Sequence, residues 1–332
     1  MAATPPRIMY YNDSRHPLIY MYEPPITRRQ WEQCVDELLG TPVDCLVFNL
    51  GTGQGMLHDT QGSGEIWGEN VEAGTHPGTG AGEWTHVIFR RAHQNMAHLL
   101  ESGLDPLAVV AERCHEHGLL LYPSLMMSDN ADDGDVRCST WRLTHRHLEI
   151  GASSEPLPQD YPDFAAGCLD FIHEEVREER LSILLDVIER YAVDGFELNL
   201  RSGSDSNFTA HFFHPSNVAA GRPLLTALVR KVREALRAKG EGLELVVRVP
   251  NLSHCEQQGL DLRGWCEMGL VDVIVGENAD GNLCDTQVDF TPLVEVAAGT
   301  GVRIFGSVYS VRTPLSLLGL RLNSPGPAVL ST

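Results

Sequence analysis

Three polar residues able to act on a substrate fall on one face of a predicted strand at residues 193–201. Glu197, Asn199 and Arg201 occupy alternate positions, and the residues between them are apolar. Because side chains alternate between the two faces of a strand, one face carries a carboxylate, an amide and a guanidinium. A strand between helices is normally apolar on both faces, and an unpaired buried charge is costly. We therefore expect this strand to end where a ligand binds.

A second carboxylate facing the same cleft would allow glycoside cleavage. In that reaction one carboxylic acid protonates the leaving oxygen, and another carboxylate acts as nucleophile or base. Glu277 follows the predicted strand at 271–275, and Asp129 follows the predicted strand at 119–125. The predicted catalytic residues are therefore Glu197 as general acid/base, with Glu277 or Asp129 as its partner.

Polar residues at the ends of other predicted strands are candidates for substrate binding. Arg248 lies on a strand between those of the two glutamates, where it could hold a carboxylate ionised or bind an acidic sugar. Trp141, in a predicted loop, could stack on a sugar ring. The predicted substrate-binding residues are Asn12, Asn49, Asn199, Arg201, Arg248 and Trp141. For each of them, a role in a turn, a cap or loop packing is the alternative.

Three histidine pairs have spacings similar to those of metal ligands, at 115/117, 145/147 and 211/214. Barrel-type metal hydrolases need such a pair at a strand end, usually that of the first strand. The first predicted strand, at 7–12, offers none. We therefore predict no metal and no other cofactor, and a metal-dependent hydrolase is a less favoured alternative.

An alternation of predicted strands and helices must position these residues. The strands are predicted at 7–12, 43–49, 119–125, 193–201, 243–249, 271–275 and 302–308, and the helices at 27–39, 85–101, 106–117, 172–191, 218–239, 261–268, 290–298 and 314–320. Repeated strand-then-helix units predict a parallel sheet. Their number predicts an α/β fold of the (β/α)8 TIM-barrel type, with the active site at the carboxyl ends of the strands. A doubly wound open sheet is the alternative.

We expect residues 1–332 to form a single barrel domain with long loops at 51–84 and 126–170. The eighth unit does not follow the pattern, because only a strand stub at 328–330 follows the last predicted helix. The eighth unit is therefore expected to be truncated or atypical.

The composition limits the classes of partner. The 332 residues are 42% hydrophobic and 21% charged, with a formal net charge of −20. That charge argues against a nucleic-acid backbone or an anionic membrane as partner. From the first residues no secretory signal is expected. The sequence contains no apolar run of the ~18 residues that span a bilayer, and its eight cysteines form no Cys-x-x-Cys pair. A cytoplasmic protein acting on a carbohydrate is expected; the oligomeric state is not indicated.

The segment from Tyr191 to Asn199 resembles a motif of a known family. Tyr-x-Val-Asp-Gly-Phe-Glu-Leu-Asn is similar to the Tyr-x-Val-Asp-Gly-Ile-Glu-Leu-Asp segment of the family 10 glycosylhydrolase-like barrels. Weaker matches lie at 103–110, 124–130, 259–265 and 269–272. The resemblance implies a (β/α)8 fold and a glycosidase with Glu197 as general acid/base. On this basis, Glu197→Gln is expected to abolish turnover while folding and sugar binding stay nearly intact.

One departure from the family motif favours a different function. Asn199 stands where the relatives tend to have Asp, so a second carboxylate on that strand is missing. Together with the atypical eighth unit, this keeps open a non-catalytic or degenerate sugar-binding barrel.

Overall fold

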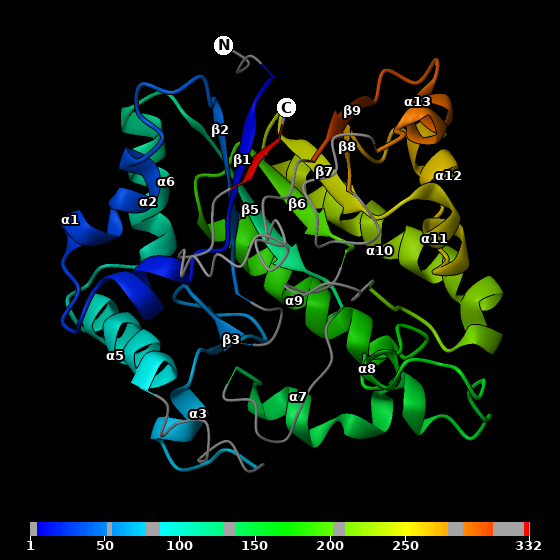
Figure 1. Cartoon of the computed structure of the whole chain (residues 1–332), viewed down its shortest axis with the longest axis horizontal. Coiled ribbons are helices and arrows are strands. Elements are labelled where there is room, and N and C mark those ends of the chain that lie inside the picture. Colours follow the sequence, from blue (N-terminus) through cyan, green and yellow to red (C-terminus); the bar gives the residue numbers. More distant parts are fainter. Residues whose placement is uncertain are drawn as a thin grey trace, which may run out of the picture.

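The centre of the molecule is a parallel sheet (Figure 1). The computed structural model describes residues 5–51, 55–77, 87–128, 137–201, 210–277, 288–307 and 329–331. Within these ranges the sheet has eight strands in the order β10-β1-β2-β5-β6-β7-β8-β9. The strands are β1 Met9–Asn12, β2 Cys45–Asn49, β5 Leu120–Met126, β6 Gly195–Asn199, β7 Glu244–Val249, β8 Val273–Gly276, β9 Arg303–Gly306 and β10 Val329–Ser331. In this sheet seven strands are parallel, namely β1, β2, β5, β6, β7, β8 and β9. The eighth, β10, runs antiparallel to β1. The predicted alternation and parallel sheet are confirmed.

The sheet is curled, so that its inner face encloses an interior. In a flat sheet β1 and β7, four strands apart, would be separated by about 19 Å. Yet the guanidinium carbon of Arg248 on β7 lies 4.7 Å from the ring centroid of Tyr11 on β1. The two ends of the sheet also approach each other, because Arg303 donates a hydrogen bond of 3.0 Å to the carbonyl of Pro6. Within the described residues β9 and β10 share no ladder, so the structure shows a curled half-barrel rather than a closed (β/α)8 barrel.

Helices flank the sheet on both sides in Figure 1, with α1, α2, α5 and α6 on the left and α10 to α13 on the right. The α-helices are α1 Arg28–Trp31, α2 Gln33–Asp36, α3 Glu69–Glu72, α5 Val87–Glu101, α6 Pro106–Glu116, α7 Thr140–Thr144, α8 Asp163–Ala166, α9 Glu174–Arg190, α10 Val218–Lys239, α11 Leu252–Gln257, α12 Leu262–Glu267 and α13 Thr291–Ala297. Shorter turns are the π-helix η1 Pro17–Met21 and the 3-10 helices η2 Arg146–Leu148, η3 Ile150–Ala152 and η4 Pro215–Asn217. No helix of the described ranges is long and apolar enough to cross a membrane.

Several predicted elements differ in detail from those observed. The helix predicted at 27–39 begins with the expected cap at Thr27 but is divided into α1 and α2. The segment predicted as a loop at 51–84 contains α3 and a two-stranded sheet of β3 Gly55–Met56 and β4 Glu65–Ile66, and the one at 126–170 contains α7, η2, η3 and α8. The strand stub pairs with β1, although in the antiparallel direction. The helix predicted at 314–320 lies outside the described residues.

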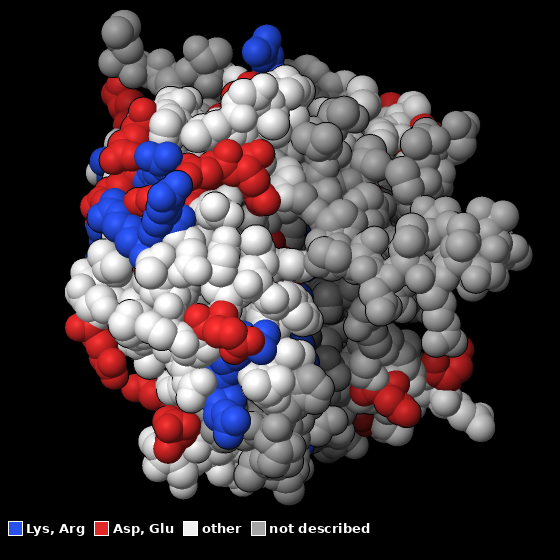
Figure 2. Space-filling model, turned by 60° about the vertical axis from the view of Figure 1, so that its left-hand side comes forward, with Lys and Arg blue, Asp and Glu red and all other residues white. Residues whose placement is uncertain are grey.

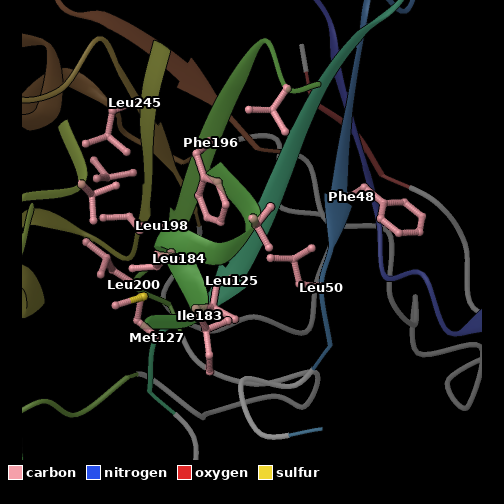
Figure 3. Close-up of a cluster of buried hydrophobic side chains, with 14 of the residues drawn as sticks. Phe48, Leu50, Leu125, Met127, Ile183, Leu184, Phe196, Leu198, Leu200 and Leu245 are labelled. Atoms are coloured by element: carbon pink, nitrogen blue, oxygen red, sulfur yellow. The ribbon is translucent and has the colours of Figure 1, made fainter. Parts of the chain in front are cut away.

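The apolar core lies between the outer face of the sheet and the helices. Phe196 and Leu198 on β6 pack with Ile183 and Leu184 of α9, and these four side chains are fully buried (Figure 3). Burying large apolar side chains is the main favourable contribution to folding. The outward residues of β6 therefore hold the strand in place, which leaves its other face free to carry polar groups.

A repeated Val-Asp pair sets the register at the amino ends of alternate strands. Asp44, Asp194 and Asp272 each follow a valine and directly precede β2, β6 and β8. Each carboxylate accepts a hydrogen bond from a backbone N–H near the start of a neighbouring strand, namely Ile8 at 3.0 Å, Leu121 at 2.9 Å and Leu245 at 2.7 Å, respectively. These aspartates thus join neighbouring strands at the end of the sheet opposite to the predicted active site.

Candidate functional site

Arg248 stands at the centre of a buried charge cluster at the carboxyl ends of the strands. Its Nε and Nη2 atoms donate to Oε1 and Oε2 of Glu197 at 3.1 and 2.9 Å. Its Nη1 atom donates to Oε1 of Glu277 at 2.6 Å. The exposed fractions are 5% for Arg248, 0% for Glu197 and 4% for Glu277. Because both carboxylates bind one planar guanidinium, their nearest oxygens lie within about 8 Å of each other.

Three further side chains complete this cluster. Oγ of Ser124 donates to Glu197 at 2.8 Å, and Oγ of Ser307 donates to Glu277 at 3.3 Å. Nη1 of Arg201 forms an ion pair with Oε2 of Glu277. Two carboxylates therefore face two guanidiniums, which balances the charges of the cluster inside the sheet.

The strand register explains why these residues meet. Ser124 pairs with Glu197 across β5 and β6, and Asn199 pairs with Arg248 across β6 and β7. The inward positions earlier on the same strands are occupied by the inner cluster of apolar side chains that includes Tyr122 and Val246. β5 and β7 therefore carry apolar side chains in the middle of the sheet interior, and Ser124 and Arg248 follow them toward the carboxyl ends.

The electrostatics of the cluster favour the ionised form of Glu277. Burial opposes ionisation of Glu277, but the positive charges of Arg201 and Arg248 outweigh it and lower the pKa of this carboxyl. Burial likewise opposes the charge of Arg248, yet Glu197 and Glu277 raise its pKa above the usual value. A general acid must instead keep a proton near neutral pH and reach the leaving oxygen. Glu197 has no exposed surface and accepts hydrogen bonds from Arg248 and Ser124.

The structure does not bring all the predicted site residues together. Asn49 lies beside Ser124 in the sheet, and its side chain accepts a hydrogen bond from the N–H of Gly51. The Asn199 side chain accepts one from the N–H of Arg201. Asn12 belongs elsewhere, because its amide donates to Glu37 on the helix side of β1.

Trp141 also stands apart from the cluster. Trp141 lies on α7 and stacks on His145, with ring centroids 4.4 Å apart. It also packs against the main apolar core of the molecule. Asp129 lies outside the described residues.

The histidine pairs do not form a metal centre within the described part of the chain, where no group of three or more His, Cys, Asp or Glu residues is placed to hold an ion. His115 instead binds Asp194 at 2.9 Å. His211 accepts or donates a hydrogen bond with Tyr161 at 3.1 Å and contacts the ring of His254 at 5.9 Å.

Tyr11 is a residue of the site that the sequence motifs do not indicate. Its ring lies against the guanidinium of Arg248, which is a favourable cation–π arrangement. Its position in the first predicted strand, at the opposite parity to Asn12, is the signal that could have identified it as inward-facing.

Comparisons with known proteins identify a fold. No family model and no curated protein matches this chain. Among solved structures, α-L-fucosidase isoenzyme 2 from Paenibacillus thiaminolyticus matches with a TM-score of 0.50 and 14% identity, over 90% of this chain and 39% of that one. This chain thus spans about two fifths of the fucosidase's length.

Two further solved structures match with lower scores. The PgaB (BpsB) glycoside hydrolase domain from Bordetella bronchiseptica matches with a TM-score of 0.48 and 11% identity, over 82% of this chain and 74% of that one. The pneumococcal virulence factor StrH matches with a TM-score of 0.47 and 12% identity, over 90% and 64% of the two chains. The similarity to the fucosidase shows that this chain has a glycosidase-like barrel fold.

Proposed function

We propose that this chain is a carbohydrate-active glycoside hydrolase that acts at the carboxyl ends of its strands, with Glu277 as the ionised carboxylate. The supporting observation is the position of Glu277 directly after β8, where Arg201 and Arg248 lower its pKa. A carboxylate that stays ionised is what the nucleophile or base of a glycosidase requires. The likeness of residues 191–199 to the family 10 glycosylhydrolase-like barrels is part of this proposal.

The roles of the other residues differ from those predicted from the motif. Glu197 holds Arg248 by two hydrogen bonds, and Arg248 in turn positions Glu277, so Glu197 is a positioning residue. The proton for the leaving oxygen must come from another group, and Asp129 after β5 is the candidate. As the bond between the anomeric carbon and this oxygen breaks, Glu277 or a water that it activates bonds to the carbon. Asn49, Asn199 and Arg201 would bind sugar hydroxyls.

A non-catalytic sugar-binding barrel is the second candidate. The observation in its favour is that both carboxylates already have arginine partners and little or no exposed surface. In that case the cluster would hold the strand ends together, and the sugar would bind above it without being cleaved.

Hydrolysis and binding should be measured side by side. Release of reducing sugar from neutral and acidic oligosaccharides would identify a substrate, and Glu277→Gln and Asp129→Asn would then be compared with the parent chain. We expect each to lower kcat by about 10²- to 10⁴-fold. Glu244→Gln is the matched control, because Glu244 also pairs with an arginine, Arg303, but at the amino end of β7.

The results separate the two candidates. Full activity of a folded Glu277→Gln variant on a cleaved substrate would contradict the proposed role. Saturable sugar binding without any cleavage, weakened by substitutions at Asn199 or Arg201, would support the binding barrel.

A further inference from the structure

A cavity of about 270 Å³ lies on the helix side of β1, lined by Asn12, His16, Pro17, Met21, Gln33, Cys34, Asp36 and Glu37. Its walls come from the end of β1, the π-helix η1 and the helix α2. Asn12 contributes from the face of β1 opposite to Tyr11, which contacts Arg248 inside the sheet. The cavity, here called the β1 pocket, is therefore separated from the Glu197–Arg248–Glu277 cluster by the strand itself.

His16 gives the β1 pocket a polar group without a partner. Its Nδ1 atom lies 3.3 Å from Oδ1 of Asp13, and Nη2 of Arg15 binds the other oxygen of that carboxylate at 3.3 Å. Asp13 thus fixes the orientation of the imidazole. The opposite nitrogen, Nε2, is buried and has no hydrogen-bond partner. A buried polar atom of this kind is costly unless a ligand or water binds it.

Glu37 supplies the second polar group of the β1 pocket. Its Oε1 atom accepts hydrogen bonds from the hydroxyl of Tyr10 at 3.2 Å and the amide of Asn12 at 3.3 Å. Both contacts reach the same oxygen, so the carboxylate is oriented while Oε2 receives neither of these bonds. Partial burial raises the pKa of Glu37.

The neighbouring acid, Asp36, is compensated by a surface cation. Nε of Arg113 binds it at 2.7 Å, within the mixed acidic and basic surface of α1, α2 and α6 that Figure 2 shows. With Asp36 paired, the net charge that the β1 pocket presents to a ligand is small. This argues for a neutral ligand rather than a strongly charged one.

The backbone around His16 is unusual for a connection after a strand. The π-helix η1 begins directly after it, and Ser14, fully buried, has a φ of 60°. π-helical turns are rare and occur frequently at functional sites, and left-handed backbone at a residue other than glycine is found disproportionately there.

The β1 pocket is not arranged for thiol catalysis. Cys34 lines it, but Nε2 of His16 makes no hydrogen bond, so this imidazole nitrogen does not activate the thiol. Burial also raises the pKa of Cys34 well above its usual value. Binding, rather than covalent chemistry, is what these side chains support.

We propose that the β1 pocket is a binding site for a small, neutral, polyhydroxylated ligand of monosaccharide size, with Nε2 of His16 and the carboxylate of Glu37 binding its hydroxyls. A hydroxyl group both donates and accepts, so it satisfies the imidazole in either protonation state and the carboxylate as well. The volume lies just below the ~300 Å³ at which pockets for small ligands begin. Pro17 and Met21 provide an apolar wall. This inference does not depend on the proposed hydrolase activity.

The test is a titration of the full chain with D-glucose, D-galactose, D-mannose, L-fucose and myo-inositol, followed by the ring resonances of ¹³C-labelled histidine. We expect at least one of these probes to move the His16 resonance in a saturable way. Glu37→Gln should weaken that binding by about tenfold or more, as expected for loss of a hydrogen bond to a charged group. Met21→Trp should block it while preserving the fold, because Met21 is 51% exposed and lines the pocket.

The control is Glu277→Gln, which should leave the His16 shift unchanged. Loss of the shift in this variant, with the shift kept in Glu37→Gln and Met21→Trp, would place the ligand in the sheet interior and overturn the inference. It would also be overturned if none of the five probes moved the His16 resonance, or if crystals soaked in the best probe held only water in the β1 pocket.

Discussion

Arg248 donates a hydrogen bond to each carboxylate oxygen of Glu197, from Nε at 3.1 Å and from Nη2 at 2.9 Å. Two parallel bonds of this type fix both the distance and the plane of the pair. Since neither side chain has appreciable contact with solvent, water cannot replace either partner. The pair therefore contributes to the stability of the strand ends as well as to the site.

Glu197→Gln should destabilise the protein. Removing one member of a buried ion pair leaves the other charge uncompensated and costs about 3–5 kcal/mol. Glu277 remains bound to Arg248, so we expect a loss near the lower end of this range. Urea unfolding followed by circular dichroism would measure it. This expectation replaces the one from the motif, in which folding was nearly unaffected.

The double variant Arg248→Met with Glu197→Gln is the control for that prediction. It removes the orphaned guanidinium, so its loss of unfolding free energy should be smaller than the sum of the two single losses. An unchanged unfolding midpoint in Glu197→Gln would show that the pair is not buried as described.

Asp272→Asn should weaken the amino end of the sheet. Asp272 accepts from the N–H of Leu245 at 2.7 Å and binds Arg233 at 2.7 and 3.0 Å. Charge-assisted hydrogen bonds of this kind contribute about 1.5–3 kcal/mol each, so we expect a loss of roughly that size in the free energy of unfolding. Glu112→Gln, which removes an exposed partner of Arg28, is the control and should not measurably change the unfolding midpoint. Equal effects of the two variants would contradict the role given to Asp272.

The strand pattern made much of this fold predictable. The parallel strands are apolar runs followed by polar residues, and strand order in a repeating β/α chain follows sequence order. That order alone places Arg248 between Glu197 and Glu277. The long segments without periodicity, which contain β3 and β4, could not be predicted in the same way because two-residue strands leave no repeat.

The roles within the site were less predictable, because they depend on contacts made across the sheet. Sequence shows that Glu197 lies on the polar face of a strand, but not that Arg248 uses both of its oxygens. The position of Asn12 at a strand end predicts substrate binding, although strand alternation puts Asn12 on the same face as Tyr10, a residue of the outer core. The β1 pocket likewise depends on η1, and a π-helix has no characteristic sequence period.

Stability should depend on pH through His211. Burial, together with the neighbouring His254, lowers the pKa of His211 to about 4, while an unfolded histidine has a pKa of about 6.5. As the pH falls, the unfolded state therefore binds a proton at His211 before the folded state does. Neutral His211 makes its full contribution to the free energy of unfolding above about pH 6.5. This contribution, of up to roughly 3 kcal/mol, is lost as the pH falls to about 4.

Urea unfolding at several pH values would measure this effect. His211→Gln keeps a hydrogen-bonding group near Tyr161 but cannot titrate, so its unfolding free energy should fall less between pH 7 and 4 than that of the parent. His117→Gln, at an exposed position, should leave the pH dependence unchanged. Identical slopes for His211→Gln and the parent would contradict the prediction.

Gly221→Ala should destabilise the protein although Gly221 lies within the helix α10. In a helix, replacing glycine by alanine normally gains about 1 kcal/mol. Here an added Cβ would lie 2.2 Å from Cε1 of Phe213, a side chain with 1% exposure. The ring would have to move in a packed core, which typically costs 1–3 kcal/mol. Thermal and urea unfolding of the variant should therefore show a net loss.

Phe213 also connects this helix with His211, which lies only two residues before it in the chain. Gly221→Ala should therefore shift the ring resonances of His211 as well as lower the midpoint of unfolding. Adding Phe213→Leu, which shortens the obstructing side chain, should reduce the loss caused by the alanine. If Gly221→Ala were instead as stable as the parent, the ring of Phe213 would be free to move, which would contradict the tight packing of Phe213 against α10.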